Sequence, residues 1–222
     1  MAELLPIFPL PNVVLFPNVF LPLHIFEPRY RQMVADALAS DRLIGMVLLK
    51  PGWEHEYEGR PPVYPIGCSG VITHVDKLPD GRYNIVLRGV ERFRILGEEH
   101  QRPYRFASVE TVSERTLGVD DRAALRRERS KLEGLLAPVV ERDVARVPAH
   151  RESRSTGDPM LPAEMADEDL VNALAQYLDF EPLEKQALLE RQCLRSRAES
   201  LVELLEMKLI AAHTPCGSHC SH

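Results

Sequence analysis

Short apolar runs separated by prolines open the chain, up to Pro28. Proline fixes φ, removes a backbone donor and disfavours helix at the residue before it, so this stretch fits neither a long helix nor a central strand. We expect two short strands, Leu5–Phe8 and Val13–Phe16, followed by an extended crossing segment. A helix then begins at Pro28, because proline suits the first helical position and apolar residues recur at helical spacing from Tyr30 onward.

Alternating apolar and polar residues predict further strands in the middle of the chain. An almost continuous apolar run at Leu43–Lys50 is typical of a strand covered on both faces, and the polar, Gly- and Pro-rich segment after it predicts a loop. Alternation then resumes, with expected strands from Ile66, at Tyr83–Leu87, at Val90–Leu96 and at Phe106–Val112. Closely spaced short strands with one helix among them favour a small barrel.

The apolar spacing becomes helical from Asp120 onward. Expected helices start there, near Asp167 and at Pro182, and Ser196 with Glu199 forms a capping box for the last one. Pro138 is the point at which the first of these helices would be interrupted. We therefore expect a barrel domain at 1–117, a helical bundle at 118–212 with a linker inside it at 149–162, and a flexible tail at 213–222 that carries cysteine and histidine.

Three stretches in order resemble a known family. They are LPIFPLPNVVLFP with PLHIFEPRY near the start, Pro65–Ile95, and Leu170–Leu205. Together they resemble the amino-terminal domain of Lon proteases. The resemblance implies an α+β fold in which a PUA-like β-barrel is followed by a helical bundle, and it implies recognition of proteins and self-association. In full-length Lon proteases an ATPase and a peptidase with a Ser–Lys pair follow this domain, and the sequence ends before either would begin.

Composition and charge narrow the class of protein. With 45% hydrophobic and 27% charged residues the chain has an ordinary globular composition. Its formal charge of −6 gives no general attraction to nucleic acid or to anionic lipid. The start lacks the basic residues of a secretory signal, and no apolar run is long enough for a membrane helix. We expect a cytoplasmic protein with no membrane partner.

Motifs of nucleotide or hydrolytic chemistry do not occur in the sequence. It contains no G-x-x-x-x-G-K-[ST], no G-x-S-x-G and no H-E-x-x-H. Ser69 lies in G-C-S-G, but the chain continues there as a strand, so we interpret these small residues as a tight β-bend. We expect no catalytic residue, no enzymatic activity and no cofactor, apart from the metal considered next.

The tail holds soft ligands close together. They are His213, Cys216, His219 and Cys220. Thiolate and imidazole are the ligands that zinc prefers, so a zinc site is one interpretation. The other is a frayed terminus, because structural zinc sites join two separated segments and this tail has no second cluster.

Aromatic and charged residues around the crossing segment are the binding candidates. The aromatic ones are Phe20, Phe26, Tyr30 and Trp53, and the charged ones are Glu27, Arg29 and Arg31. Aromatic residues in proline-rich or polar segments are typical of interaction surfaces. Two alternatives stay open: the aromatics, with Phe16, plug the barrel, and the charges are a solvated helix start.

These observations favour a non-catalytic module that binds unfolded or degron-bearing polypeptides. It would be an adaptor or regulator of a proteolytic machine, with self-association into a homo-oligomer as a further expectation. One alternative is an RNA-binding PUA-like protein, with a basic stripe of Arg88, Arg92, Arg94, Arg102 and Arg105, although the negative charge disfavours a nucleic-acid partner. The other is an enzyme of unknown type, which would need a deep pocket with convergent titratable groups.

Overall fold

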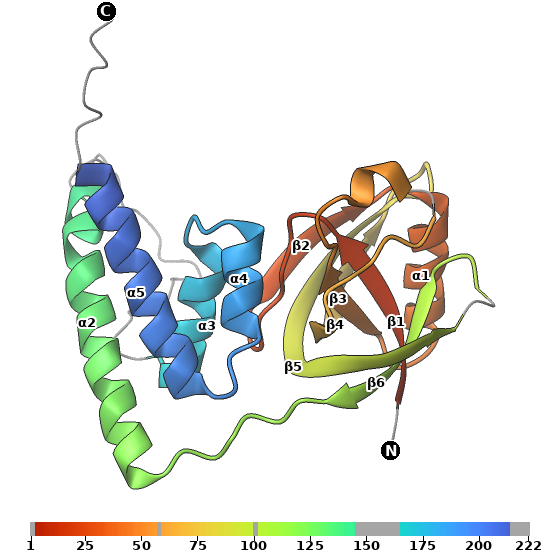
Figure 1. Cartoon of the computed structure of the whole chain (residues 1–222). Helices are drawn as coiled ribbons and strands as arrows, with labels where there is room; N and C mark the ends of the chain where they lie inside the picture. The colour runs from red at the N-terminus through yellow and green to blue at the C-terminus, as the bar shows by residue number, and fades with distance from the viewer. Residues whose placement is uncertain (1–2, 57–58, 100–101, 145–164, 214–222) are drawn as a thin grey trace, which may run out of the picture. The chain divides into compact units, whose positions relative to one another are not determined.

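The structure, a computed structural model, describes residues 3–56, 59–99, 102–144 and 165–213. Strands come first and most helices last, as in the predicted α+β class (Figure 1). The strands are β1 (Glu3–Leu10), β2 (Phe20–Ile25), β3 (Leu43–Leu48), β4 (Ile66–Lys77), β5 (Tyr83–Glu99) and β6 (Arg105–Thr111). The helices are α1 (Pro28–Leu38), the 3-10 helix η1 (Trp53–Glu56), α2 (Val119–Val144), α3 (Asp167–Tyr177), α4 (Pro182–Leu189) and α5 (Leu194–His213).

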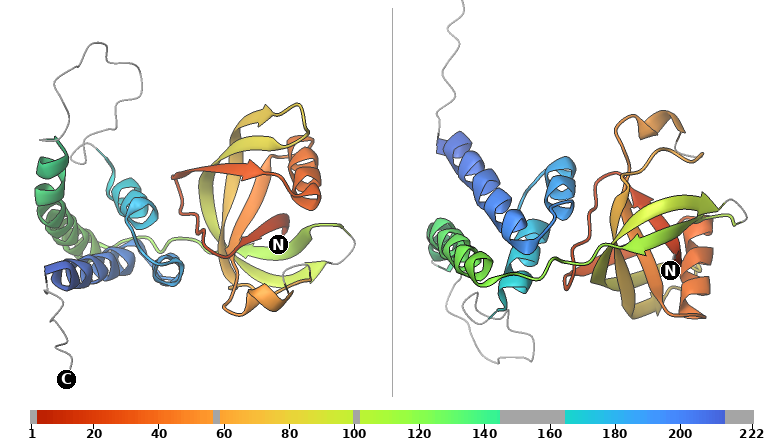
Figure 2. Two further views of the ribbon diagram at one scale, coloured as in Figure 1. Left: turned by 90° about the horizontal axis from the view of Figure 1, so that it is seen from above. Right: turned by 60° about the horizontal axis from the view of Figure 1, so that its bottom comes forward.

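Five of these six strands close into a ring. The sheet order is β2-β5-β4-β3-β1-β6, and β6 pairs back on β5 (Figure 2). Strands β1 and β3 are parallel, and the other pairs are antiparallel. Two parts of the long β5 pair with different strands: Tyr83–Arg88 pairs with β2, and Phe93–Glu99 pairs with β6. The ring confirms the predicted barrel and leaves β2 as an edge strand outside it.

Alternate residues of the strands fill the ring. One core cluster consists of Leu5, Ile7, Val47, Phe93, Ala107 and Val109, all buried. They come from four different strands, so the ring holds together through side chains as well as through its ladders. Burial of each large side chain contributes about 1.5–3 kcal/mol.

Helix α1 begins where the sequence predicted. Glu27 is its N-cap with an extended backbone, and Pro28 is its first residue. The predicted apolar face is buried, and the Tyr30 ring packs on the Phe8 ring of β1 with centroids 4.4 Å apart. Helix α1 therefore covers part of the outside of the ring.

The predicted strand Val13–Phe16 is wrong. These residues form no strand, and β2 lies later, in the predicted crossing segment. The backbone N–H of Phe16 donates to Gln176 Oε1 at 3.3 Å, and the Phe16 carbonyl lies so close to Gly89 that a Cβ there would overlap it. Contacts with distant residues thus replace the ladder that a strand would have provided. Pro22 is tolerated inside β2 because an edge strand has one side without ladder hydrogen bonds.

Three boundaries also differ from the prediction. The two strands expected at Tyr83–Leu87 and Val90–Leu96 are one strand, β5. Helix α2 continues through Pro138. Helix α5 begins at Leu194, so Ser196 lies inside its first turn, where its hydroxyl donates to the Cys193 carbonyl.

Contacts divide the chain into two units. Unit 1 is Met1–Arg115 with Asn172–Arg191, and unit 2 is Thr116–Val171 with Gln192–His222. Residues 172–191 were expected in the helical bundle, but by their contacts they group with the barrel. The predicted domain ranges 1–117 and 118–212 stay a prediction. Within unit 2, α2 packs along α5, and Arg195 pairs with Asp121 at 2.9 Å.

Candidate functional site

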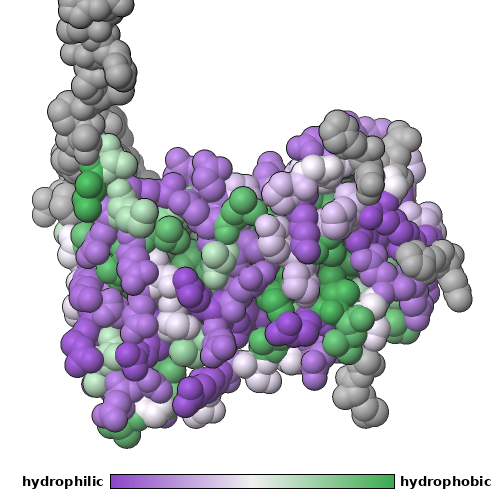
Figure 3. Space-filling model, viewed as in Figure 1, coloured by the Kyte–Doolittle hydropathy of each residue, from purple (hydrophilic) through white to green (hydrophobic). Residues whose placement is uncertain are grey.

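The predicted aromatic cluster separates into core and surface. Phe16 is buried, as the plug interpretation expected. Phe20, the first residue of β2, is 49% exposed, and Phe26, just after β2, is 60% exposed. Large apolar side chains at this exposure contribute little to the core, so they leave an apolar surface at the edge strand. In Figure 3, hydrophobic side chains also gather over the strands of unit 1 within a mostly hydrophilic surface.

The outer edge of β2 carries backbone groups that β5 does not use. The Gly89 N–H donates to the Val19 carbonyl, so the backbone groups of the next residue, Phe20, point away from β5. The Tyr177 hydroxyl donates to the Phe20 carbonyl at 2.9 Å, consistent with that direction. Because the direction alternates along a strand, Pro22 and His24 also present their backbone groups at this edge.

Side chains next to this edge are held in place. His24 hydrogen-bonds through Nδ1 to Asn84 Oδ1 at 2.7 Å, and its ring lies roughly parallel to that of Phe26 with centroids 6.3 Å apart. Arg82 Nη1 lies 3.3 Å from His24 Nε2. The imidazole therefore lies beside the exposed ring of Phe26 and is itself held by hydrogen bonds on both ring nitrogens.

The charged candidates at the start of α1 do not act as one group. Arg29 Nε pairs with Glu27 Oε2 at 2.9 Å, and the Arg29 guanidinium lies 4.7 Å from the centroid of the Tyr30 ring. Tyr30 is 5% exposed, so the buried ring contributes to this site by packing against the Arg29 guanidinium in a cation–π contact. Arg31 points elsewhere, because its Nη1 donates to the Asp80 carbonyl at 3.2 Å in the β4–β5 turn.

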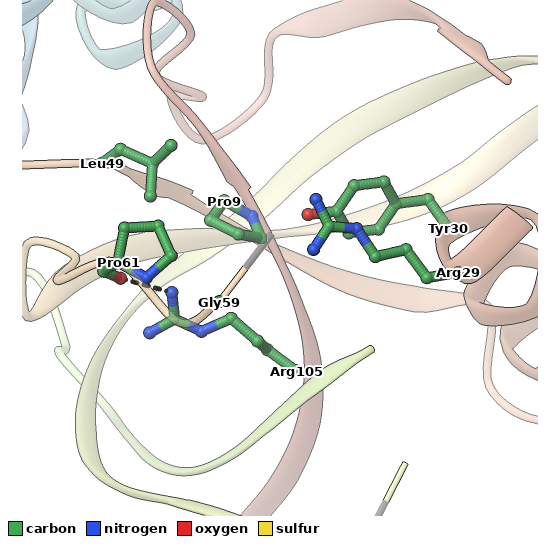
Figure 4. Close-up of a pocket in the computed structure, with 7 residues that line it drawn as sticks. All are labelled: Pro9, Arg29, Tyr30, Leu49, Gly59, Pro61 and Arg105. Carbon is green, nitrogen blue, oxygen red and sulfur yellow. Dashed lines mark hydrogen bonds between the residues drawn. The ribbon is translucent and has the colours of Figure 1, made fainter. Parts of the chain in front are cut away.

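A pocket that the sequence did not predict lies beside Arg29 and Tyr30. Its other lining residues are Gly59, Arg60, Pro103, Tyr104 and Arg105, and its volume is about 200 Å³; we call it the arginine pocket. A smaller adjoining recess adds Pro9, Leu49 and Pro61 (Figure 4). These residues come from β1, α1, β6 and the segments before β4 and β6, so no local motif marks them.

Hydrogen bonds fix the walls of the arginine pocket. The buried Arg105 pairs with both carboxylate oxygens of Glu98 and donates from Nη1 to the Pro61 carbonyl at 2.6 Å (Figure 4). The Tyr104 hydroxyl donates to Asp36 Oδ2 at 2.7 Å. Burial, reinforced by this hydrogen bond, raises the pKa of Tyr104, while Arg102 acts in the opposite direction. Tyr104 is therefore neutral at physiological pH.

Trp53 lies in η1 and is partly buried. It belongs to unit 1, like the edge strand and the arginine pocket. Its place in the predicted site stays a prediction.

Of the predicted zinc ligands, His213 is the last residue of α5, and Cys216, His219 and Cys220 lie outside the described residues. The described part of the chain contains no group of three or more His, Cys, Asp or Glu side chains arranged to hold a metal ion. It also contains no helix with the length and apolarity to span a membrane.

The predicted basic stripe is interrupted. Arg88 and Arg94 are exposed, but Arg92 is 2% exposed and donates to the carbonyl oxygens of Leu189, the last residue of α4, and of Arg191. Arg105 is buried against Glu98, and Arg102 pairs with Asp36 at 3.4 Å. Three of the five arginines thus form ion pairs within the described part of the protein, which weakens the case for a surface that follows a phosphate backbone.

Comparison with solved structures supports the fold. The chain is similar to the N-terminal domain of a Mycobacterium avium complex Lon protease, with a TM-score of 0.64 at 16% identity, covering 92% of this chain and 98% of that one. It is also similar to a Lon N-terminal domain protein from Xanthomonas campestris, with a TM-score of 0.56 at 22% identity, covering 96% of this chain and 99% of that one.

Comparison with curated sequences points the same way. The Lon protease of Flavobacterium johnsoniae is 29% identical over 213 residues, and Lon protease 2 of Myxococcus xanthus is 29% identical over 208 residues. These alignments cover 92% and 93% of this chain, which spans about a quarter of each relative (24% in both). The model of the ATP-dependent protease La (LON) substrate-binding domain matches residues 4–207. The chain therefore belongs to the Lon substrate-binding domain family.

Proposed function

We propose that this chain is a non-catalytic module that binds unfolded or degron-bearing polypeptides. Family membership supports binding to polypeptides in general, since the matched domain is the substrate-binding domain of a protease. The observation that carries the proposal is the exposed edge of β2. Its outward backbone groups do not pair with β5, and the exposed rings of Phe20 and Phe26 lie beside them.

The mechanism we propose is strand addition. An extended polypeptide lies along the outer edge of β2 and hydrogen-bonds to the backbone of Pro22 and His24, while its apolar side chains contact Phe20 and Phe26. Backbone hydrogen bonds are the same for every sequence, so this mode suits a module that accepts many unfolded clients. Pro22 removes one N–H from the edge, which limits pairing between copies of β2.

The other candidates contribute around this edge. Glu27 and Arg29 pair with each other just after Phe26, and Arg31 reaches the β4–β5 turn instead, so we propose that these residues add charge selection at two separate places. Tyr30 acts by supporting Arg29, and Trp53 is a further contact whose contribution is tested separately. A module that holds a client in this way would serve as an adaptor to a proteolytic machine, or as a competitor of one.

The test measures affinity for a permanently unfolded protein, reduced and carboxymethylated α-lactalbumin, by fluorescence anisotropy. Phe20→Ser and Phe26→Ser should each weaken binding on the order of tenfold, because large aromatic side chains dominate such interfaces. Leu96→Ser is the matched control, since Leu96 is 56% exposed on β5. Unchanged affinity in both phenylalanine variants would overturn the proposed surface.

Trp53 is tested in a pull-down with wild-type and Trp53→Ala protein, followed by identification of the retained proteins. Equal retention by the two removes Trp53 from the site. Reduced retention by the variant, with unchanged thermal stability, extends the binding surface to η1.

A further inference from the structure

We propose that the arginine pocket binds a carboxylate group of a polypeptide; this inference rests on the polypeptide-binding function proposed above. Three arginines line the pocket, Arg29, Arg60 and Arg105, together with two tyrosine rings. In the described part of the chain no acidic residue lines it. Its volume of about 200 Å³ leaves room for a carboxylate and for atoms of the residue that carries it.

The pocket is built before any ligand arrives. Glu98 holds the buried Arg105 through both carboxylate oxygens, and the Pro61 carbonyl fixes its third nitrogen. Arg29 is held by Glu27 and by the face of Tyr30, as Figure 4 shows for the ring. Side chains that are already ordered lose little conformational entropy on binding, so such a pocket suits a small polar group.

Charge balance selects the class of anion. In the described part of the chain, the groups that line the pocket or form ion pairs with its arginines comprise three guanidinium groups and two carboxylates, those of Glu27 and Glu98. One positive charge is left over. A carboxylate carries one negative charge and matches it, whereas a phosphate group with nearly two would leave an excess of negative charge.

Arg60 is the residue best placed to receive the ligand. Its hydrogen bond to the Glu99 carbonyl and its ion pair with Glu98 both use Nη1. Within the described chain neither Nε nor Nη2 forms a hydrogen bond, and the side chain is 31% exposed, so a ligand can reach these nitrogens from solvent. The planar guanidinium fork matches the two oxygens of a carboxylate.

A polypeptide offers two sources of this group, its C-terminus and its acidic side chains, and three peptides distinguish them. The probe is a labelled, N-acetylated peptide of leucine, alanine and phenylalanine. The first form has a free C-terminal carboxylate, the second a C-terminal amide, and the third the amide with one internal aspartate. Fluorescence anisotropy should show at least one acidic form binding roughly tenfold more tightly than the neutral form, as charge-assisted hydrogen bonds predict.

Arg60→Gln should abolish this difference between acidic and neutral peptides. Arg126→Gln is the matched control, because Arg126 is an exposed arginine of α2 in unit 2. Equal binding of all three peptides by the wild-type protein would overturn the pocket proposal and leave polypeptide binding intact. An acid preference that survives Arg60→Gln would overturn it as well.

A second measurement tests carboxylate binding in the arginine pocket without any peptide. Propionate is titrated into the protein, and the backbone amide signals of Arg29, Arg60 and Tyr104 are followed by NMR. Saturable shifts that Arg60→Gln abolishes would support carboxylate binding in the pocket. If such shifts are seen and no peptide binds, the carboxylate site stands and only the proposed polypeptide-binding function is contradicted. Absence of shifts would contradict the proposal, and so would larger shifts with inorganic phosphate at equal concentration.

Discussion

Arg92 Nη1 donates a hydrogen bond to the Leu189 carbonyl at 3.0 Å, which joins β5 to the end of α4 across 97 positions of sequence. The same nitrogen donates to the Arg191 carbonyl, and Nη2 lies 3.3 Å from Glu114 Oε1. A buried cation at the C-terminus of a helix satisfies carbonyl groups that have no partner within the helix, and it interacts favourably with the helix dipole. Arg92 therefore fixes α4 to the barrel within unit 1.

Arg92→Met should destabilise the protein by about 3 kcal/mol, because it leaves buried carbonyls and the Glu114 carboxylate without their cation. Urea unfolding followed by circular dichroism measures this loss. Arg94→Met, two residues along β5 and exposed, should change the free energy of unfolding by less than about 0.5 kcal/mol. Similar effects of the two substitutions would show that Arg92 is not a structural anchor.

Gly89→Ala should cost about 2–3 kcal/mol, since the new Cβ would overlap the Phe16 carbonyl and force the backbone of one segment to move. Gly97 lies on the same strand, and a Cβ added there would meet no heavy atom within 4 Å, so Gly97→Ala should be nearly neutral. Thermal unfolding of both variants tests the difference. Equal melting temperatures would contradict the close crossing of the two segments.

Hydrogen exchange should reveal the open edge of β2. The His24 amide points away from β5 and should exchange quickly, whereas Leu23 and Ile25 donate toward β5 and should exchange slowly. Saturation with reduced, carboxymethylated α-lactalbumin should slow the exchange of His24 and leave the other two nearly unchanged. A fast His24 amide in the bound state would exclude strand addition as the mode of binding.

Stability at alkaline pH should depend on Tyr104. Its pKa is raised in the folded protein by burial and by Asp36, so the neutral form stabilises the fold below the unfolded pKa of about 10. That stabilisation is lost as the pH rises through the folded pKa. At pH 8 Tyr104→Phe should be less stable than wild type by about 1 kcal/mol through the lost hydrogen bond to Asp36.

The gap between wild type and Tyr104→Phe should shrink as the pH rises above 10, because only the wild type must keep a buried hydroxyl neutral. Melting temperatures between pH 8 and pH 11.5 test this. Tyr64→Phe controls for alkaline effects on a tyrosine outside this network, since its hydroxyl has no hydrogen bond to Asp36. A constant gap across this range would contradict the assigned cause.

The sequence by itself determined the elements whose signals are local. Pro28 and the apolar spacing after it set the start and the buried face of α1, because proline and side-chain periodicity act within a few residues. Alternation likewise predicted β4 and β6, because side chains on opposite faces of a strand give a period of two. The sequence left open whether Phe20 and Phe26 plug the barrel or face solvent.

Tertiary structure decided what depends on distant partners. Val13–Phe16 has a strand-like pattern, but Gln176 takes the Phe16 N–H, and β2 forms at Phe20–Ile25 instead. The arginine pocket gathers residues from segments far apart in the chain, and a guanidinium that looks like surface in sequence becomes a buried anchor at Arg92. Hydrogen bonds and ion pairs of this kind carry no sequence period, because folding alone brings their partners together.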